Sequence, residues 1–103
     1  MNLFKNLFGA TPTIDFKKLV DEGAVIVDVR TPQEYRQGHV SSSINIPLDE
    51  IRLSVNDLKK KNKPVITVCR SGARSGTAES ILHASGIECY NGGPWDSLEK
   101  KIK

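Results

Sequence analysis

Cys69 has the most distinctive chemical setting in this sequence. It ends a short apolar run, Val65–Cys69, which is typical of a buried parallel strand. A small-residue loop follows and leads into a helix, so we expect the thiol to face a helix amino terminus. The free N–H groups there stabilise an anion, and the thiolate anion is the reactive form of cysteine. The sequence therefore predicts a cysteine nucleophile at the carboxyl end of a strand, where α/β proteins bind ligands.

The loop after Cys69 contains the residue types that a thiolate site needs. Nearby arginines lower the pKa of a thiol from about 8.5. Glycine permits a positive φ, so that successive N–H groups converge on one point, and small neighbours leave that point open. We expect Cys69 to be catalytic and the following residues to bind substrate: Arg70, Ser71, Gly72, Ala73, Arg74 and Ser75. The alternative is a buried structural cysteine, but packing alone requires neither arginines nor a glycine turn.

Three segments of the chain resemble the rhodanese family, the sulfurtransferases that carry sulfur as a cysteine persulfide. The first segment is Asp28–Val40 with Ile44–Pro47, the second is the loop at Cys69, and the third is Asn91–Trp95. They occur in the family's order, and the likeness runs from about residue 14 to residue 98. The chain has Ser41–Ser43 where many relatives have Pro-Gly-Ala, which leaves the conformation of that turn open.

The resemblance implies a sulfurtransferase that acts through a Cys69 persulfide. Thiosulfate or a similar small anion would donate its outer sulfur, and cyanide, a thiol or a protein acceptor would then take it. No cofactor is needed, because the sulfur is carried covalently. The alternatives are a persulfide carrier or sensing module for protein partners, and a phosphatase. Phosphatases of this fold have seven-residue loops, whereas Cys69 to Arg74 spans six residues and suits a single sulfur atom.

Length and charge limit the range of functions. The 103 residues are 38% hydrophobic and 26% charged, which fits one ordinary globular domain. The net charge of +3 attracts small anions weakly and does not by itself indicate a nucleic acid partner. The lysine-rich segments 59–63 and 100–103 fall at predicted helix ends and lack interleaved aromatic residues. We therefore expect no nucleic acid partner.

The cysteines and the amino-terminal segment suggest a cytoplasmic location. A disulfide between Cys69 and Cys89 would consume the nucleophile, so both thiols are expected to be free. Cys89 alternates with Ile87 on a predicted strand and is expected to be a core residue rather than a resolving thiol. Residues 1–12 form a predicted leader before a domain over residues 13–103. The leader lacks a signal-peptide core, and its apolar face is expected to pack on the domain or on a partner, not on a membrane.

The alternation of helices and strands predicts the fold class. We expect an α/β protein, a single rhodanese-like domain with a mostly parallel central sheet and helices on both faces. Strands are predicted over residues 24–29, 44–46, 65–69 and 87–90, the last before a Gly-Gly turn. Helices are predicted over residues 15–22, from a Thr31–Glu34 capping box to Gly38, over 48–60, and through 77–84.

The remaining polar residues have simpler predicted roles. His39 is expected to form a local hydrogen bond, with acid–base catalysis as the alternative, and His83 is a weaker candidate for catalysis. Asp28 is expected to pair with Arg30 or to cap a turn. No metal site is predicted, because the two cysteines lie twenty positions apart and no CxxC or HxxxH spacing occurs.

Overall fold

The computed structural model describes residues 13–103 and shows a four-stranded, entirely parallel sheet. The predicted leader, residues 1–12, lies outside the described residues. The strand order across the sheet is β2-β1-β3-β4. The strands are β1 (Val25–Asp28), β2 (Ile44–Asn45), β3 (Val65–Cys69) and β4 (Cys89–Pro94). The α/β fold class with a parallel sheet is therefore confirmed.

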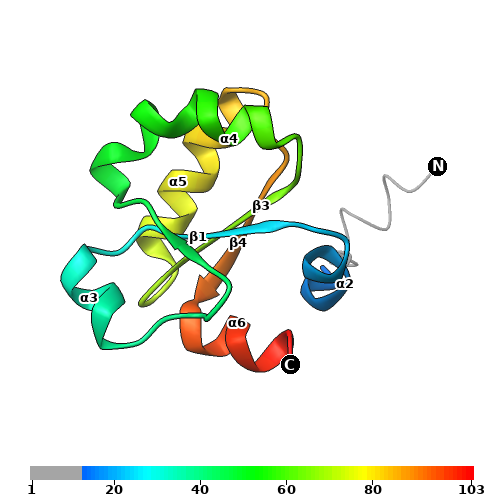
Figure 1. Cartoon of the computed structure of the whole chain (residues 1–103), viewed down its shortest axis with the longest axis vertical. Helices are drawn as coiled ribbons and strands as arrows, with labels where there is room; N and C mark the ends of the chain where they lie inside the picture. Colours follow the sequence, from blue (N-terminus) through cyan, green and yellow to red (C-terminus); the bar gives the residue numbers. More distant parts are fainter. Residues whose placement is uncertain (1–12) are drawn as a thin grey trace, which may run out of the picture.

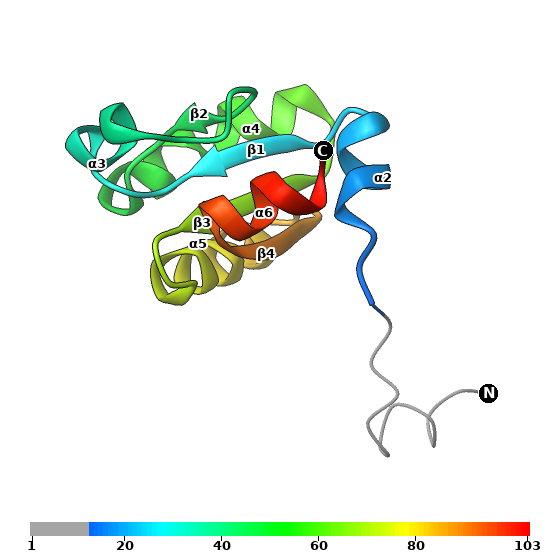
Figure 2. The same ribbon diagram turned by 90° about the horizontal axis from the view of Figure 1, so that it is seen from below.

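Helices cover both faces of this sheet. Figures 1 and 2 show α4 and α5 on one face and α2 and α6 on the other, with α3 beyond the end of the sheet at which β1 finishes. The helices are α2 (Phe16–Asp21), α3 (Pro32–Gln37), η1 (Leu48–Ser54, a 3₁₀ helix), α4 (Val55–Lys61), α5 (Ala73–Ala84) and α6 (Trp95–Lys101). Among residues 13–103, no helix has the length and hydropathy needed to span a bilayer.

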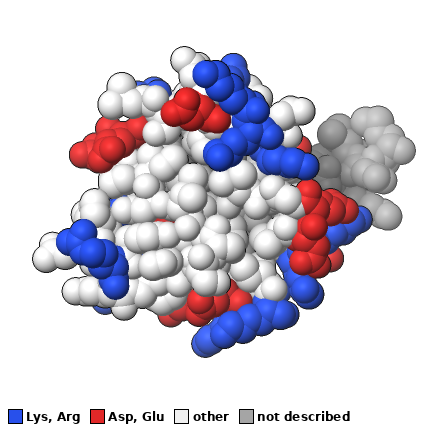
Figure 3. Space-filling model, viewed as in Figure 1, with Lys and Arg blue, Asp and Glu red and all other residues white. Residues whose placement is uncertain are grey.

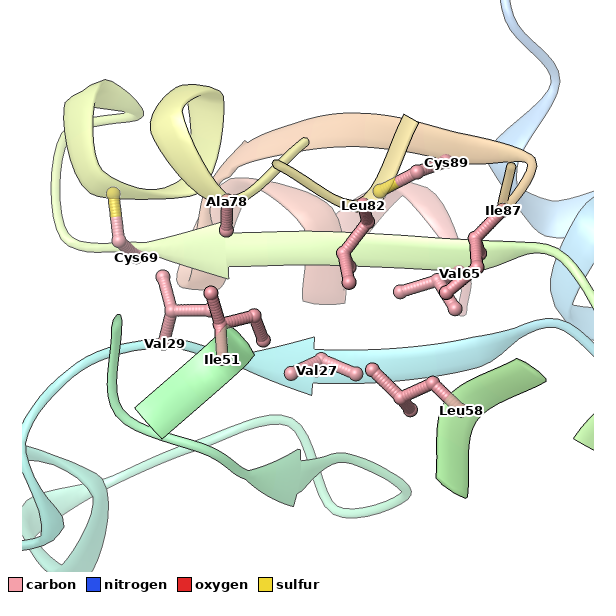
Figure 4. Packing of buried hydrophobic residues seen from close by; sticks show 10 residues of the cluster. All are labelled: Val27, Val29, Ile51, Leu58, Val65, Cys69, Ala78, Leu82, Ile87 and Cys89. Carbon is pink, nitrogen blue, oxygen red and sulfur yellow. The ribbon is translucent and has the colours of Figure 1, made fainter. Parts of the chain in front are cut away.

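The central strand β3 is buried along its whole length and divides the core into two layers. Val65 and Cys69 face the layer that contains Leu82 of α5, whereas Ile66 and Val68 face the layer beneath α6. Figure 4 shows the first of these layers. Successive side chains of a strand point to opposite faces, so a central parallel strand must be apolar on both. This packing holds the carboxyl end of β3, and with it Cys69, in a rigid position.

The capping box at the start of α3 is present as predicted. The Thr31 hydroxyl accepts the Glu34 N–H at 3.2 Å, and the Glu34 carboxylate accepts the Thr31 N–H at 3.1 Å. Pro32 occupies the first helical position, where its missing N–H costs nothing. The box fixes the position of the Glu34 side chain, which proves important for the loop after Cys69.

The predicted single helix over residues 48–60 is wrong, because the segment divides into η1 and α4. Pro47 precedes η1 and provides no side chain that caps the free N–H groups. Tighter bonds between residues three apart satisfy them instead, as in the 2.8 Å bond from the Glu50 N–H to the Pro47 carbonyl. Ile51 of η1 and Leu58 of α4 both face the core.

The last strand is longer than predicted, and the Gly-Gly pair lies within it rather than in a turn after it. Gly92 and Gly93 belong to β4, and Gly93 pairs with Val68 of β3. A Cβ atom on Gly92 would lie 2.8 Å from the Ile66 side chain and 3.0 Å from the Thr67 carbonyl oxygen. Only glycine permits this close approach of the two strands, which carries β4 as far as the end of β3.

The helix after the loop also starts earlier than the segment predicted for it. Its first residue is Ala73, four positions before Thr77, and it ends at Ala84 as expected. Gly72 adopts a φ of +100°, and this left-handed conformation lets the chain turn from the loop directly into α5. The residues expected to form an irregular loop therefore include the first turn of a helix.

Candidate active site

The Cys69 sulfur lies at the centre of a ring of hydrogen-bond donors. The Gly72 N–H donates to Sγ at 3.0 Å and the Ser75 N–H at 3.4 Å, while the Ser75 hydroxyl oxygen lies 3.3 Å away. Figure 4 shows the sulfur at the end of β3, pointing toward the first turn of α5. No side chain caps that helix, and the Ser75 N–H in its first turn donates to the sulfur instead.

The hydrogen bonds favour the ionised form of Cys69. Burial is the largest single influence and opposes ionisation, since a charged sulfur loses its hydration. The backbone N–H groups of Ser75, Gly72 and Ser71, together with the Ser75 hydroxyl when it donates to the ionised sulfur, outweigh burial, and the pKa of Cys69 lies below its ordinary value. The predicted convergence of loop N–H groups on the sulfur is thus present, but the main causes that lower the pKa of Cys69 are hydrogen bonds and not the charges of the predicted arginines.

Arg74 is paired with a carboxylate on α3. Its two terminal nitrogens donate to the Glu34 carboxylate at 2.7 and 3.0 Å, a bidentate pair. The Arg74 hydrogen bond lowers the pKa of Glu34 from 4.5 to about 2, with further help from the Thr31 N–H. The geometry favours a bracing role for Arg74, because the pair connects the first turn of α5 to α3 across 40 positions of sequence.

Arg70 is the exposed cation of the loop. Its side chain forms no ion pair or hydrogen bond with any residue of the described segment 13–103, and it lines a polar cavity of about 390 Å³. Glu34 and Trp95 line the same cavity, as do Arg30, Gln37, Gly38 and Asp96. An exposed guanidinium at the edge of a polar cavity is suited to attract a small anion.

A buried ion pair lies beside the polar cavity that Arg70 lines. Asp28, at the end of β1, is fully buried and accepts hydrogen bonds from the Arg30 side chain at 2.8 to 3.1 Å. Arg30 also donates to the Gly38 carbonyl oxygen at 2.6 Å and lies over the Trp95 ring, 5.0 Å from its centroid. The predicted pairing of Asp28 with Arg30 is confirmed.

Asn91 joins the loop to β4. Its side-chain oxygen accepts the Ser75 hydroxyl at 2.7 Å and the Gly93 N–H at 2.9 Å, while its amide nitrogen donates to the Gly72 carbonyl at 3.1 Å. The Asn91 backbone N–H donates to Glu79 of α5 at 3.1 Å. This one side chain therefore contacts both residues whose N–H groups hold the Cys69 sulfur.

The structure brings the loop residues together around Cys69 but gives them different environments. Ser75 is buried, Gly72 and Arg74 are half-buried, and Ser71 and Ala73 are exposed beside Arg70. Two residues with direct structural links to the loop, Glu34 and Asn91, were not predicted as part of the site. The Glu34 capping box and the position of Asn91 before the Gly-Gly pair were visible in the sequence, but neither indicated a contact with the loop.

Cys89 lies far from the candidate site. It pairs with Val65 at the start of β3, whereas Cys69 pairs with Pro94 at the other end, and Figure 4 shows the two thiols well separated. Val65 and Cys69 are four positions apart on β3, which corresponds to about 13 Å along the strand. Burial is the main cause that raises the pKa of Cys89 to about 12. Its predicted place in the core is confirmed, and it is too remote to act as a resolving thiol for Cys69 in this fold.

His39 forms the local contact that its sequence position suggested. Its Nδ1 lies 2.6 Å from the Tyr35 carbonyl oxygen, and its ring stacks on that of Tyr35 with centroids 3.7 Å apart. His83 is exposed on α5. Within residues 13–103, no three His, Cys, Asp or Glu side chains form a cluster suited to a metal ion. On the face in Figure 3, basic side chains lie around the rim among acidic ones and form no continuous basic stripe.

Comparisons with known proteins agree with this geometry. The Rhodanese-like domain family matches residues 13–94. The chain is 41% identical over 80 residues to the thiosulfate sulfurtransferase PspE of Escherichia coli, covering 75% of this chain and 77% of PspE. It is 35% identical over 71 residues to a sulfurtransferase of Allochromatium vinosum, covering 68% of this chain and 65% of that protein.

Comparison with solved structures supports the same family. The structure described as "rhodanese with anions from E. coli" superimposes with a TM-score of 0.66 and 36% identity, over 72% of this chain and 89% of that one. The family match spans both the strands that form the sheet and the loop that surrounds Cys69. The chain therefore belongs to the rhodanese-like domain family.

Proposed function

We propose that this protein is a sulfurtransferase that takes a sulfane sulfur from a small anionic donor such as thiosulfate and passes it to a thiol or to cyanide. The observation that carries the proposal is the ring of donors around the Cys69 sulfur, with N–H groups at 3.0 and 3.4 Å. Such a ring stabilises negative charge on a sulfur atom. The similarity to named sulfurtransferases supports the same chemistry.

In the first half-reaction, the Cys69 thiolate attacks the outer sulfur of thiosulfate. A bond forms between Sγ and that sulfur, the bond from the sulfur to the sulfite group breaks, and sulfite leaves with the bonding electron pair. The product is a Cys69 persulfide with its negative charge on the terminal sulfur. N–H groups of the loop stabilise that charge as an oxyanion hole stabilises oxygen. Arg70, unpaired within residues 13–103, would attract the dianionic donor toward the loop.

In the second half-reaction, an acceptor attacks the terminal sulfur of the persulfide. With cyanide the products are thiocyanate and the Cys69 thiolate, so the enzyme returns to its starting state without an external oxidant or reductant. Cys69 is fully buried, and both substrates therefore reach its sulfur only when the covering groups move apart. The cycle needs a reduced Cys69, which suits a reducing compartment such as the cytoplasm.

The geometry of Arg74 argues against phosphatase chemistry. Both of its terminal nitrogens donate to Glu34, which leaves fewer of its five N–H donors for the oxygens of a phosphoryl group. The six-residue span from Cys69 to Arg74 already suits one sulfur atom better than three phosphoryl oxygens. The sulfurtransferase proposal therefore fits both the loop length and the pairing of Arg74 with Glu34.

The proposal is tested by steady-state turnover of thiosulfate and cyanide. Cys69→Ser removes the nucleophile and is expected to reduce thiocyanate formation to the uncatalysed level while the circular dichroism spectrum remains unchanged. Cys89→Ser is the matched control, since it changes a buried thiol that is remote from the loop. Equal activity of the two folded variants would contradict the proposal.

A further inference from the structure

The Ser75 hydroxyl has one proton and two neighbours that compete for it. The Asn91 side-chain oxygen lies 2.7 Å from Ser75 Oγ, and the Cys69 sulfur lies 3.3 Å away. An amide oxygen carries no hydrogen and only accepts. In this arrangement the hydroxyl therefore donates to Asn91 and directs a lone pair toward the sulfur.

The backbone determines which way the Asn91 amide group faces. The Gly93 N–H, which can only donate, lies 2.9 Å from the Asn91 oxygen, and the Gly72 carbonyl, which can only accept, lies 3.1 Å from its nitrogen. Exchanging the two amide atoms would place two donors together at Gly93 and two acceptors together at Gly72. The oxygen therefore faces Ser75, and the direction of the Ser75 proton follows from it.

This arrangement suits the thiol form of Cys69 but not the thiolate. A thiol donates its S–H to the free lone pair of Ser75. Once the proton has left, the sulfur only accepts, and a lone pair directed at it from 3.3 Å is repulsive. The repulsion is removed if the Ser75 O–H rotates from Asn91 to the sulfur, which leaves the Asn91 oxygen with the Gly93 N–H alone.

We propose that the Ser75 hydroxyl has two positions and that Asn91 is the positioning residue that sets its resting position. While Cys69 keeps its proton, the hydroxyl donates to Asn91. When Cys69 loses its proton, the hydroxyl turns from Asn91 to the sulfur. The step balances: the Cys69 proton passes to solvent and its S–H···O bond to Ser75 is lost, while one O–H···O bond breaks and one O–H···S bond forms. Asn91 touches neither the sulfur nor a substrate in this arrangement. It acts through Ser75, by making the thiol form more stable than the loop alone would make it.

The charged groups around the loop do not replace this switch. The loop carries Arg70, and α5 carries Arg74 and Glu79. The charged residues on the elements packed around them are Glu34 on α3, Asp28 and Arg30 at the end of β1, and Asp96 on α6. Glu34 is paired with Arg74, Asp28 with Arg30, and Glu79 accepts the Asn91 N–H. Substituting the Asn91 side chain changes none of these charges.

The test is a double-mutant cycle between Asn91 and Ser75, read as the pKa of Cys69. Thiolate ultraviolet absorbance is followed against pH in a Cys89→Ser background, so that only Cys69 contributes. Asn91→Ala removes the O–H···O bond that stabilises the thiol form and is expected to lower the pKa of Cys69 by up to about one unit, the worth of one neutral hydrogen bond. In a Ser75→Ala background, Asn91→Ala is expected to leave the pKa unchanged.

The proposal is overturned if Asn91→Ala raises the pKa or leaves it unchanged when Ser75 is present, or if any fall persists when Ser75 is alanine. A merely structural role would disorder the donor ring and raise the pKa in both backgrounds. Asn91→Leu, of similar size and without an acceptor, gives the same test if the alanine variant is unfolded. Asn45→Ala is the matched control, since within residues 13–103 the Asn45 side chain donates only to the Asp28 and Arg30 carbonyls.

Only the expected effect of Asn91→Ala on turnover rests on the proposed nucleophilic role of Cys69, whereas the expected pKa change does not. The titration uses no donor or acceptor, so it can fail while sulfur transfer is present, or succeed while sulfur transfer is absent. Turnover of thiosulfate by the same variants is measured separately. A lower pKa in Asn91→Ala should extend activity to lower pH, and an unchanged pH profile together with an unchanged titration would remove Asn91 from the mechanism.

Discussion

Replacing Glu34 by glutamine isolates the ion pair that connects α3 to the start of α5. Glutamine keeps an oxygen that accepts the Thr31 N–H, so the capping box survives. It loses the charge that engages Arg74 through bonds of 2.7 and 3.0 Å. We expect Glu34→Gln to destabilise the fold modestly and to reduce sulfur transfer, because the loop around Cys69 loses its anchor.

The magnitude follows from the pKa of Glu34 and from its exposure. A fall in that pKa from 4.5 to about 2, to which the Arg74 hydrogen bond contributes most and Thr31 contributes as well, would correspond to about 3 kcal/mol for a carboxylate shielded from water. The Arg74 and Glu34 side chains are 37% and 29% exposed. Solvent screening therefore reduces the contribution to about 1 kcal/mol. A double-mutant cycle with Arg74→Gln is expected to give a coupling free energy of about the same size.

The pH dependence has a definite sign. A carboxyl group whose pKa is lower in the folded protein stabilises the fold above its unfolded pKa, and this stabilisation is lost as the pH falls from 4.5 toward 2. Urea unfolding of the wild type and of Glu34→Gln should therefore differ most near neutral pH and converge in acid. A stability difference that stays constant down to about pH 3, or a coupling free energy of zero, would refute this account of the pair.

Three further outcomes are expected. Arg70→Ala should raise the KM for thiosulfate more than Arg52→Ala, an exposed control on η1, and the difference should shrink at high salt; equal effects would show that Arg70 adds only to the general charge. A glycine inserted between Gly72 and Ala73 should reduce thiocyanate formation, whereas one inserted between Ser41 and Ser42 should not; unchanged activity in the first variant would refute the loop-length argument. Gly92→Ala should lower the free energy of urea unfolding by about 1–3 kcal/mol, because its Cβ meets β3; wild-type stability would contradict the close strand contact.

The sequence was sufficient to predict the fold and the convergence of the loop on Cys69, because these follow from local patterns. The apolar run before Cys69 predicted β3, and the Thr31–Glu34 capping box predicted the start of α3; both are confirmed. The division of residues 48–60 into η1 and α4 was missed, because apolar spacing alone does not distinguish the tighter winding of a 3₁₀ turn from an α-helix.

The contacts between distant segments could not be predicted in this way. Arg74 meets Glu34 across 40 positions and Asn91 meets Ser75 across 16. Such pairs depend on how α3, α5 and β4 come together in space, and no periodicity or capping signal records that. Gly92 belongs with them, since the need for glycine arises from the neighbouring strand rather than from a turn.

The most direct test of the central claim is the mass of the intact protein after incubation with thiosulfate and removal of small molecules. The account predicts the addition of one sulfur atom to the wild type and to Cys89→Ser, none to Cys69→Ser, and loss of the added sulfur on exposure to cyanide with one thiocyanate released for each protein molecule. An unmodified wild type, or a sulfur atom retained by Cys69→Ser, would contradict the claim that Cys69 carries sulfur as a persulfide.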